Sequence, residues 1–451
     1  MLRRRRLLQG EHSVRHGPAR LSRRHGRSDR HGRGRAAVKI AILTNAYPYH
    51  PGEQFMEDEI AFWAGNPVAE VTLLPAVAAG EPRPLPAGIA VDLGMAGGSR
   101  LARLRCVLRA AGSQLFRREL AYLWGSRKLR VATALRAILH TSKVLEQQQR
   151  LERYARTHGR IDVAYCYWNE TQSYAALRAR AAGAVRKVVS RLHGFDLYEA
   201  RREHAYMPLK RQFIGCFDTL FALSREARTY LEATYGAPAG NTRISPLGVP
   251  LTGALSAASP PGFLHLVSVS SCLPVKRLDR IVEALHLLAR RHAQARITWT
   301  HIGGGPQLAE IAQLAQTRLG GLSNVAFEFL GDLPNQVVKH YYLGTPVDVF
   351  VNTSESEGMP VSVMEAMSAG VPAVAPDVGG VSDLVSDECG ALLAASPGSG
   401  EIADAIARVA LGGEKDALRL QARRVIEARF CAGRNYPAFI AGVLAIGAAP
   451  A

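Results

Sequence analysis

The chain has 451 residues, of which 47% are hydrophobic and 7% aromatic, and it carries a formal net charge of +18. This length exceeds what one hydrophobic core organises, so we expect two or more domains. The six cysteines are scattered without a Cys-x-x-Cys pair, which argues against a disulfide framework or a zinc site and favours the reducing cytoplasm. No run of about 18 apolar residues occurs, so a membrane-spanning helix is not expected.

The positive charge is concentrated in two segments. Residues 1–37 hold 12 Arg against Glu11 and Asp29, a net charge of +10, and residues 100–160 hold 15 Lys and Arg against three Glu, a net charge of +12. The rest of the chain therefore has a net charge of −4. Charge alone is then a weak argument for nucleic-acid binding, because the basic residues are not spread over the folded part.

Residues 1–37 consist mainly of Arg, Gly, His and Ser, with hardly any apolar residue after Leu8. Such a segment cannot bury enough surface to fold, so we expect a disordered Arg-rich tail. It lacks the apolar stretch of a signal peptide. We interpret it as a solvated tail or an over-long gene start. The alternative is a nucleic-acid-binding arm, which would be expected to contain interleaved aromatic residues.

The first folded domain is expected to span residues 38–254. A buried strand at 38–44 is followed by a loop that contains Gly52 and by an amphipathic helix at 55–64. Helical patterns then separate most of the later apolar strands, which lie at 71–74, 161–168, 187–190, 219–223 and 242–245. This alternation predicts a parallel sheet with helices on both faces.

Residues 100–160 form a basic helical region of the first domain. Its apolar residues recur near helical spacing among five arginines, and Trp124 lies nearby; they are Leu101, Leu104, Val107, Leu108 and Leu115, with Arg103, Arg105, Arg109, Arg117 and Arg118. This pattern is typical of an amphipathic helix lying on an anionic membrane surface. An ordinary domain helix with a basic, solvated face is the alternative.

A turn-rich linker opens the second domain, residues 255–415, and residues 416–451 are expected to form C-terminal helices. The second domain repeats the alternation of strands and helices, with strands at 264–269, 297–302, 325–330, 347–351, 371–375 and 391–393. The sequence therefore predicts an α/β protein in which two Rossmann-like, doubly wound domains face one another across a ligand-binding cleft.

One motif carries most of the functional signal: Ser354-Glu-Ser-Glu-Gly-Met-Pro-Val-Ser-Val-Met-Glu. Glu357 and Glu365 stand eight positions apart in it, between a predicted strand and the next strand along the chain. The turn before the helix then lies at the carboxyl edge of a parallel sheet, where such sheets bind ligands. A helix start attracts phosphate, and carboxylates can hold hydroxyl groups. The motif predicts a site for a nucleotide sugar.

Together with Thr300-His-Ile-Gly-Gly-Gly-Pro, Phe329-Leu-Gly and Val378-Gly-Gly-Val, this motif resembles retaining glycosyltransferase family 4, whose members have the GT-B fold. Weaker similarity in Tyr47-Pro-Tyr and in residues 53–59 looks like the branches that make capsular or exopolysaccharide. The resemblance covers residues 38–445. It implies transfer of a sugar from a UDP- or GDP-linked donor to a saccharide or an undecaprenyl-linked acceptor.

The resemblance also implies roles for the motif. Glu365 would accept hydrogen bonds from the ribose hydroxyls of the donor, and Glu357 would lie beside the transferred sugar. The backbone at the helix start would hold the diphosphate and sugar hydroxyls; this stretch is Gly358, Met359, Pro360, Val361 and Ser362. Acids that merely favour the start of a helix are the alternative, although Glu365 lies too far along the helix for that.

Lys276 follows a predicted strand and is expected to open a helix, where its ammonium would neutralise the leaving diphosphate. Many members of the family carry an arginine where this chain has Ser271. Arg277 is the adjacent candidate for that second charge, although we expect it to point elsewhere on the helix. His193 ends a predicted strand and would contact the donor sugar, unless it is a structural histidine. Gly52 would let the backbone approach the phosphates, unless it is a plain turn glycine.

The family needs neither a metal nor a cofactor, and this chain contains no Asp-x-Asp motif. The resemblance implies front-face transfer, in which the leaving diphosphate itself accepts the proton of the acceptor. The alternatives are a GT-B sugar-nucleotide epimerase and, in a different class, a basic nucleic-acid-binding protein. We expect a cytoplasmic enzyme that touches the inner face of the plasma membrane and has no nucleic-acid partner.

Overall fold

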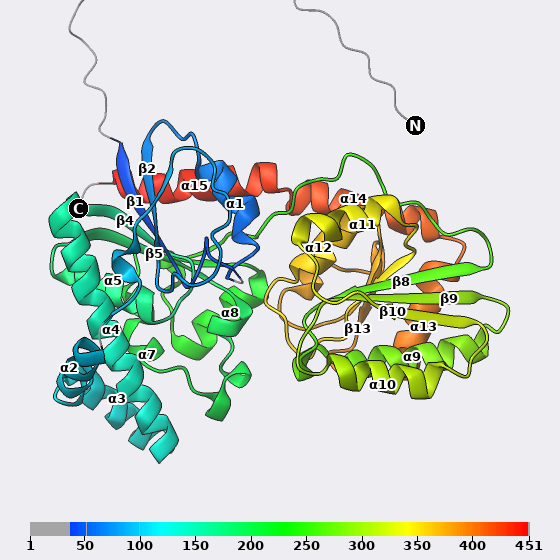
Figure 1. Cartoon of the computed structure of the whole chain (residues 1–451), viewed down its shortest axis with the longest axis horizontal. Helices are drawn as coiled ribbons and strands as arrows, with labels where there is room; N and C mark the ends of the chain where they lie inside the picture. The colour runs from blue at the N-terminus through cyan, green and yellow to red at the C-terminus, as the bar shows by residue number, and fades with distance from the viewer. Residues whose placement is uncertain (1–36, 51, 99, 450–451) are drawn as a thin grey trace, which may run out of the picture. The chain divides into compact units, whose positions relative to one another are not determined.

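The computed structural model describes residues 37–50, 52–98 and 100–449. This part of the chain contains two parallel β-sheets, each in its own α/β domain (Figure 1). The prediction of two Rossmann-like domains is therefore confirmed. The expected Arg-rich tail at 1–37 lies outside the described residues apart from Ala37.

The first sheet has the strand order β3-β2-β1-β4-β5-β6-β7, and every neighbouring pair is parallel. Its strands are β1 (Val38–Thr44), β2 (Ala69–Pro75), β3 (Ile89–Val91), β4 (Ile161–Cys166), β5 (Val185–Leu192), β6 (Thr219–Ala222) and β7 (Thr242–Ile244). The order reverses between β1 and β4, which opens a crevice at their carboxyl ends. The sequence pattern missed β3, because three mostly exposed residues give no burial signal.

The helices of the first domain include three, α2 to α4, in the basic region that the sequence predicted to be helical. They are α1 (Met56–Trp63), α2 (Arg100–Ala111), α3 (Gln114–Gly125), α4 (Val131–His158), α5 (Thr171–Ala181), α6 (Gly194–Leu197), α7 (Lys210–Phe213) and α8 (Arg225–Tyr235). Short 3₁₀ turns occur in both domains, at Leu93–Met95, Glu199–Arg201, Glu203–Ala205, Ile214–Cys216, Ala239–Asn241, Pro274–Lys276 and Val381–Asp383.

The expected interfacial stripe in the basic region is only partly correct. Leu101, Leu104 and Leu108 are exposed on α2, as an interfacial face requires. Leu115, in contrast, lies on α3 and is buried in the core of the first domain. Gly112 and Ser113 separate the two helices, and Ser113 caps α3 by accepting a hydrogen bond from the N–H of Phe116. The apolar stripe therefore does not continue from α2 into α3.

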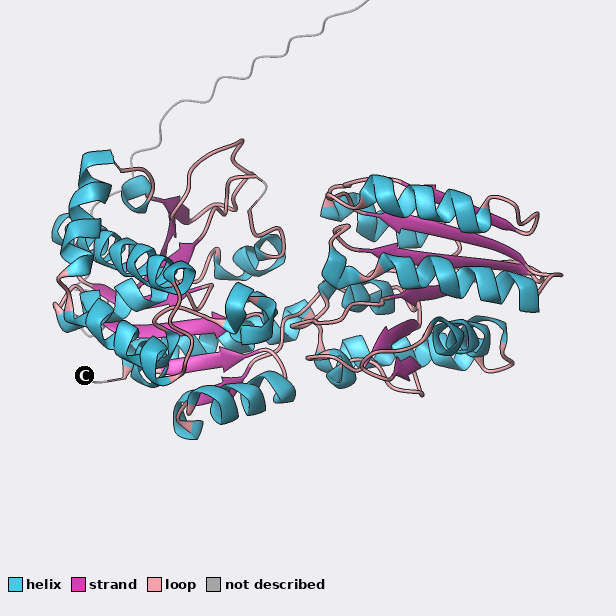
Figure 2. Ribbon diagram, turned by 90° about the horizontal axis from the view of Figure 1, so that it is seen from below, coloured by secondary structure: helices cyan, strands magenta, loops and turns pink. Residues whose placement is uncertain are grey.

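The second sheet has the strand order β10-β9-β8-β11-β12-β13 and is also parallel. Its strands are β8 (Phe263–Val269), β9 (Arg296–Ile302), β10 (Val325–Phe329), β11 (Val349–Val351), β12 (Ala373–Pro376) and β13 (Gly390–Leu393). The helices are α9 (Leu278–Arg291), α10 (Leu308–Leu319), α11 (Asn335–Gly344), α12 (Val361–Ser368) and α13 (Ser399–Leu411). Helices cover both faces of the strands (Figure 2). The order reverses between β8 and β11.

The two C-terminal helices, α14 (Lys415–Arg429) and α15 (Ala432–Ala448), pack on different domains. Helix α14 lies against α12 and α13 of the second domain, whereas α15 lies against α1 and the first sheet (Figure 1). Phe439 of α15 packs on Tyr165 and Phe221, with ring centroids 5.0 and 4.9 Å apart. The end of the chain therefore completes the core of the first domain.

Candidate functional site

The segments that follow β8 and β11 bring together two of the predicted site residues. Lys276 comes after β8 and Glu357 after β11, and these neighbouring strands flank the point where the strand order reverses. Lys276 Nζ donates a hydrogen bond to Glu357 Oε1 over 2.7 Å, and Asn352 Nδ2 donates to the same oxygen over 3.2 Å. A cation and a carboxylate thus meet where an open α/β sheet binds its ligands.

Glu357 is held ionised by its neighbours. Its side chain is buried, and burial alone would raise the pKa of the carboxyl group. The charge of Lys276 and hydrogen bonds from Lys276, Ser354 and Asn352 outweigh that effect and lower the pKa. The site therefore presents a carboxylate and an ammonium as a pair. A ligand that enters must compete with this pair or extend it.

The start of α12 has the features expected of an anion-binding helix end. Pro360 occupies the cap position, and α12 begins at Val361, as the motif predicted. The N–H groups of Val361 and Ser362 belong to the first turn, so they have no acceptor within the helix. Met359 is buried in the core of the second domain and anchors the turn. The first-turn amides and the positive end of the helix dipole therefore lie beside the Lys276–Glu357 pair.

Two glycines of the Val378-Gly-Gly-Val segment pack against this turn. Gly380 N–H donates to the carbonyl of Gly358 over 2.8 Å. Gly379 has a φ of +57°, and a Cβ at this position would collide with the carbonyl of Glu357. These glycines fix the backbone of the turn. The glycines at 303–305 act similarly, because Gly303 packs on the carbonyl of Ser270 in the segment that leads to Lys276.

Glu365 lies further along α12, buried from solvent, and accepts a hydrogen bond from Asn335 Nδ2 over 2.7 Å. Burial raises the pKa of its carboxyl group to about 7, although the bond from Asn335 and the charge of Lys339 act in the opposite direction. Lys339 itself pairs with Asp58 of α1 over 2.8 Å, which links the second domain to the first. Among the described residues, no cation is bonded to the carboxyl group of Glu365.

His193 directly follows β5, which was predicted to end at this residue, and its ring is enclosed by aromatic residues. The ring centroids of Tyr167 and Trp168 lie 4.7 and 4.6 Å from that of His193. Neither ring nitrogen of His193 has a hydrogen-bond partner among the described residues. Burial, assisted by the charge of Arg191, lowers the pKa of His193, so the ring is neutral. A neutral imidazole with free nitrogens can donate one hydrogen bond and accept another.

The backbones of the two domains meet next to His193. A Cβ at Gly194 would lie 2.7 Å from the nitrogen of Gly358, and a Cβ at Gly358 would lie 2.5 Å from the nitrogen of Gly194. Only glycine at both positions permits this approach. The contact places the end of β5 beside the turn that carries Glu357.

The loop after β1 is organised by Glu53. Its carboxylate accepts hydrogen bonds from the N–H groups of Asn45, Ala46 and Tyr47 and from Trp168 Nε1, at 2.6 to 3.0 Å. Gly52 packs within the same loop, where a Cβ would lie 2.6 Å from that of Ala46. The contacts of Gly52 therefore explain a tight turn, and its role toward phosphates stays a prediction.

The expectation that Lys276 opens a helix is wrong in detail. Lys276 ends a 3₁₀ turn, and α9 begins only at Leu278. Arg277 lies between them with a φ of +49°, and its guanidinium pairs with Asp279 over 2.9 Å and with Glu355 over 2.5 Å. Ser271 is exposed. Arg277 therefore compensates two acids in this structure and is not brought to Glu357.

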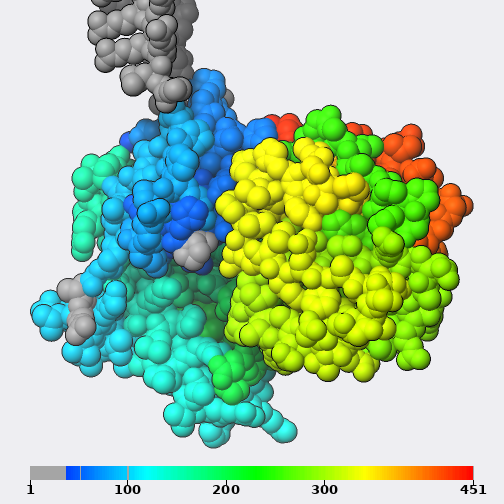
Figure 3. Space-filling view, turned by 45° about the vertical axis from the view of Figure 1, so that its right-hand side comes forward, coloured from blue at the N-terminus to red at the C-terminus, as the bar shows by residue number. Residues whose placement is uncertain are grey.

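The predicted cleft lies beside these residues, and sequence reasoning missed one arginine in it, Arg201. The cleft has a volume of about 720 Å³ and is lined from the first domain by Phe195 and Arg201, among others, and from the second by Val275 and Ser356. Figure 3 shows the side of the molecule where the first domain, in blue to green, adjoins the yellow segments of the second. Arg201 stands in no recognisable motif, so no sequence signal marked it.

Two family models match the chain. The model described as Glycosyltransferase Family 4 matches residues 108–252, and the model described as Glycosyl transferases group 1 matches residues 264–411. The two matches fall on the two α/β domains. Each α/β domain therefore matches a glycosyltransferase family.

Among known glycosyltransferases, the chain is 29% identical to D-inositol 3-phosphate glycosyltransferase of Nocardia farcinica, over 48% of this chain and 50% of that protein. It is 27% identical to the putative colanic acid biosynthesis glycosyltransferase WcaL of Escherichia coli, over 52% of this chain and 58% of that protein. The chain thus spans about half the length of these relatives.

Solved structures share the fold of this chain. HepE of Anabaena, crystallised with UDP-glucose, aligns with a TM-score of 0.61 and 18% identity, over 90% of this chain and all of HepE. At this level of identity the likeness concerns the fold alone. It confirms the prediction of a GT-B architecture.

Proposed function

We propose that the protein transfers a sugar from a nucleotide sugar to a saccharide or lipid-linked glycan acceptor during synthesis of a surface polysaccharide. The observation that carries the proposal is the Lys276–Glu357 pair beside the start of α12, at the reversal point of the second sheet. The matches to the two glycosyltransferase family models support the reaction class, and the similarity to a colanic acid enzyme supports the kind of product.

In the proposed complex the donor lies along the second domain. Its diphosphate occupies the start of α12, where the amides of Val361 and Ser362 are free to donate and Lys276 supplies a positive charge. Its ribose lies at Glu365, whose carboxylate accepts from the two ribose hydroxyls. UDP and GDP are both compatible with this arrangement. The UDP-glucose complex of HepE, which has the same fold, favours UDP.

Transfer proceeds in this proposal with retention of the anomeric configuration and without a metal ion. The acceptor hydroxyl attacks the anomeric carbon on the face that the diphosphate leaves, a new glycosidic bond forms as the sugar–phosphate bond breaks, and the proton passes to a diphosphate oxygen. Lys276 and the amides of α12 stabilise the charge that builds on the diphosphate. Glu357 stabilises the electron-poor sugar, and neutral His193 positions a sugar hydroxyl.

The acceptor side of the proposal includes the membrane. Exposed apolar side chains lie on α2 and α3, with Leu101 70%, Leu108 67% and Trp124 76% exposed, and arginines surround them on the same helices. Within the described residues, the structure contains no helix that is long and apolar enough to cross a membrane. We propose that this basic, apolar surface rests on anionic lipid at the inner face of the plasma membrane, within reach of an undecaprenyl-linked acceptor.

A screen of UDP- and GDP-sugars by thermal shift, followed by incubation of the stabilising donor with undecaprenyl-linked acceptors in EDTA, tests the proposal. We expect a saccharide product whose new linkage keeps the anomeric configuration of the donor. An epimerised donor without a saccharide product would instead support the sugar-nucleotide epimerase. Activity that is lost in EDTA and restored by a divalent cation would contradict metal independence.

A further inference from the structure

A second cavity lies in the first domain, next to the cleft. It has a volume of about 340 Å³, within the range of small-molecule sites. Its walls come from α4, from the segment after β4 and from residues 195–208. Phe195 and Arg201 line both this cavity and the cleft, so the two spaces adjoin there. The proposed donor residues all lie in the second domain, apart from His193 and Gly52.

Most charged residues around the cavity are compensated by neighbours. Arg202 pairs with Glu170, and Arg136 pairs with Glu203. The Asp196 carboxylate accepts hydrogen bonds from two backbone N–H groups and lies near the charge of Lys210. Burial lowers the pKa of His140, which therefore adds no charge near neutral pH.

Arg201 is the exception among the described residues of the cavity wall, because its guanidinium has no ion pair or hydrogen bond with another described residue. The guanidinium lies against Gly194, at the same place where the backbone of Gly358 approaches from the second domain. Its positive charge thus faces the two cavities, within a short distance of the proposed transfer site.

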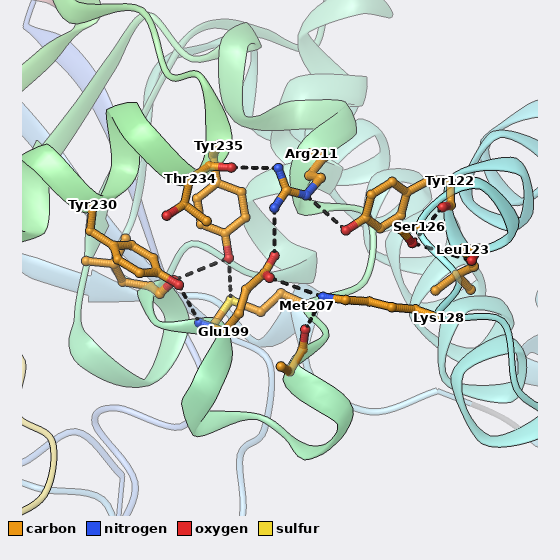
Figure 4. Close-up of polar contacts among 12 residues, drawn as sticks. Tyr122, Leu123, Ser126, Lys128, Glu199, Met207, Arg211, Tyr230, Thr234 and Tyr235 are labelled. Atoms are coloured by element: carbon orange, nitrogen blue, oxygen red, sulfur yellow. Dashed lines mark hydrogen bonds and ion pairs between the residues drawn. The ribbon is translucent and has the colours of Figure 1, made fainter.

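The segment that carries Arg201 is held in place by its other side chains. Glu199 pairs with Lys128 and Arg211, and its N–H donates to the hydroxyl of Tyr230 over 3.0 Å (Figure 4). Tyr198 donates its hydroxyl hydrogen to Glu226, on α8. The backbone of the turn that carries Arg201 is therefore braced, and only the side chain of Arg201 must become ordered when it binds a ligand.

A second unsatisfied donor lines the same cavity. Asn169 is 1% exposed, and its Oδ1 accepts a hydrogen bond from Lys210 Nζ over 2.6 Å, which fixes the orientation of the amide. The Nδ2 group of this amide has no acceptor among the described residues. A buried donor without a partner is unfavourable, and an oxygen of a bound ligand would satisfy it.

Phe195 adds an apolar surface between the cavity and the cleft. Its side chain is 50% exposed, and the guanidinium of Arg202 stacks over the ring at 3.4 Å from the centroid. An aromatic ring held in this way can pack against the apolar face of a sugar. The cavity thus combines an uncompensated cation, an unsatisfied amide donor and an aromatic surface.

We infer that this cavity is the acceptor subsite and that it takes a saccharide carrying an anionic group, a carboxylate or a phosphate, which Arg201 binds. The sugar ring lies on Phe195, with its reactive hydroxyl toward the cleft and the anion in the cavity beside Asn169. This inference rests on the proposed glycosyl transfer and adds the chemical class of the acceptor.

Saccharide binding in the absence of nucleotide tests the inference. Dissociation constants of methyl glucuronide, glucose 6-phosphate and neutral methyl glucoside are measured by ligand-observed NMR with the full chain. We expect one or both anionic sugars to bind about 10-fold more tightly than the neutral sugar, because a charge-assisted hydrogen bond is added. Arg201→Gln should abolish this preference, Arg201→Lys should restore part of it, and Arg228→Gln, a surface control on α8, should leave it unchanged.

Three results would overturn the inference: equal binding of the three sugars by the wild type, no detectable binding of either anionic sugar, or a preference that survives in Arg201→Gln. UDP and GDP titrations run in parallel. If Arg201→Gln weakens nucleotide binding about 10-fold, Arg201 belongs to the donor site and the inference is also wrong. Failure of both nucleotides to bind the wild type would contradict the proposed function. The comparison of saccharide affinities could still be interpreted, because it is made without nucleotide.

Discussion

At the scale of single residues, the site depends on which charges are compensated before a ligand binds. Glu357 already has its cation in Lys276, whereas Glu365 has a hydrogen-bond donor but no bonded cation in the part of the chain that the structure describes. The first arrangement keeps a carboxylate ionised in a buried position. In the second, a carboxyl group with one hydrogen-bond donor would gain further donors when hydroxyl groups arrive.

Removing the ammonium of Lys276 should therefore damage turnover more than folding. Lys276→Ala is expected to lower kcat by about 100-fold or more, because the charge on the leaving diphosphate loses its stabilising cation. Lys143→Ala, an exposed position on α4, is the matched control. Steady-state kinetics with the productive donor give the comparison. Equal kcat values for the two variants would remove Lys276 from the site.

Donor binding should depend on the protonation of Glu365. Its pKa is about 7, and the ribose hydroxyls bind the ionised form, so affinity for UDP or GDP should rise as the pH increases through 7. Titration calorimetry between about pH 6 and about pH 8.5 measures this dependence. Glu365→Gln should bind the nucleotide weakly at every pH. A variant with wild-type affinity would exclude contact between Glu365 and the ribose.

The same carboxyl group should reduce stability at high pH. Its pKa in the folded protein, about 7, lies above the ordinary value of 4.5, so ionisation becomes unfavourable to folding as the pH rises from 4.5 through 7. Glu365→Gln should therefore unfold like the wild type at about pH 4 and be more stable by on the order of 2 kcal/mol above pH 8. Urea denaturation at both pH values checks this. A variant less stable than the wild type at the higher pH would contradict the expectation.

At the scale of elements, the turn between β11 and α12 is positioned by close backbone contacts. Gly358 meets Gly194 across the two domains, and Gly379 and Gly380 support the turn from the same domain. Gly358→Ala should lower kcat by about 10-fold or more, because the new Cβ forces the two backbones apart and small displacements misalign reacting groups. Gly442→Ala on α15, where a Cβ meets nothing within 4 Å, is the control. Similar activity of both variants would show that the approach is not needed.

The basic helical region at 100–160 is also expected to bind lipid. In flotation assays, the wild type should bind vesicles that contain anionic phosphatidylglycerol and should be released by salt, because arginines and exposed leucines act together. A double change of Leu104→Glu and Leu108→Glu on α2 should abolish binding without unfolding the protein, since both side chains are exposed. Binding that is insensitive to anionic lipid and to both substitutions would contradict the membrane proposal.

The sequence predicted the elements whose signals are local. Periodicity located most strands, and the motif around Glu357 identified the turn and helix because its residues are contiguous. The sequence could not predict that Arg277 adopts a left-handed conformation and pairs with Glu355. This pairing depends on a segment far along the chain. Nor could the sequence predict the meeting of Gly194 and Gly358, or the uncompensated charge of Arg201. These features arise only when distant loops converge.

At the scale of the whole molecule, each sheet reverses its strand order once, and the described site residues cluster at those two points. The first sheet contributes the loop after β1 and the end of β5, and the second contributes Lys276, Glu357 and α12. Contacts between Gly194 and Gly358 and between Asp58 and Lys339 join the two domains beside these positions. A donor bound to the second domain would therefore lie within reach of an acceptor bound to the first.

A crystal structure with UDP or GDP, whichever raises the melting temperature, tests the central claim most directly. We expect the diphosphate to lie at the first turn of α12 beside Lys276 and the ribose hydroxyls to donate hydrogen bonds to Glu365. A nucleotide bound elsewhere, for example along the first sheet with the Lys276–Glu357 pair untouched, would contradict it.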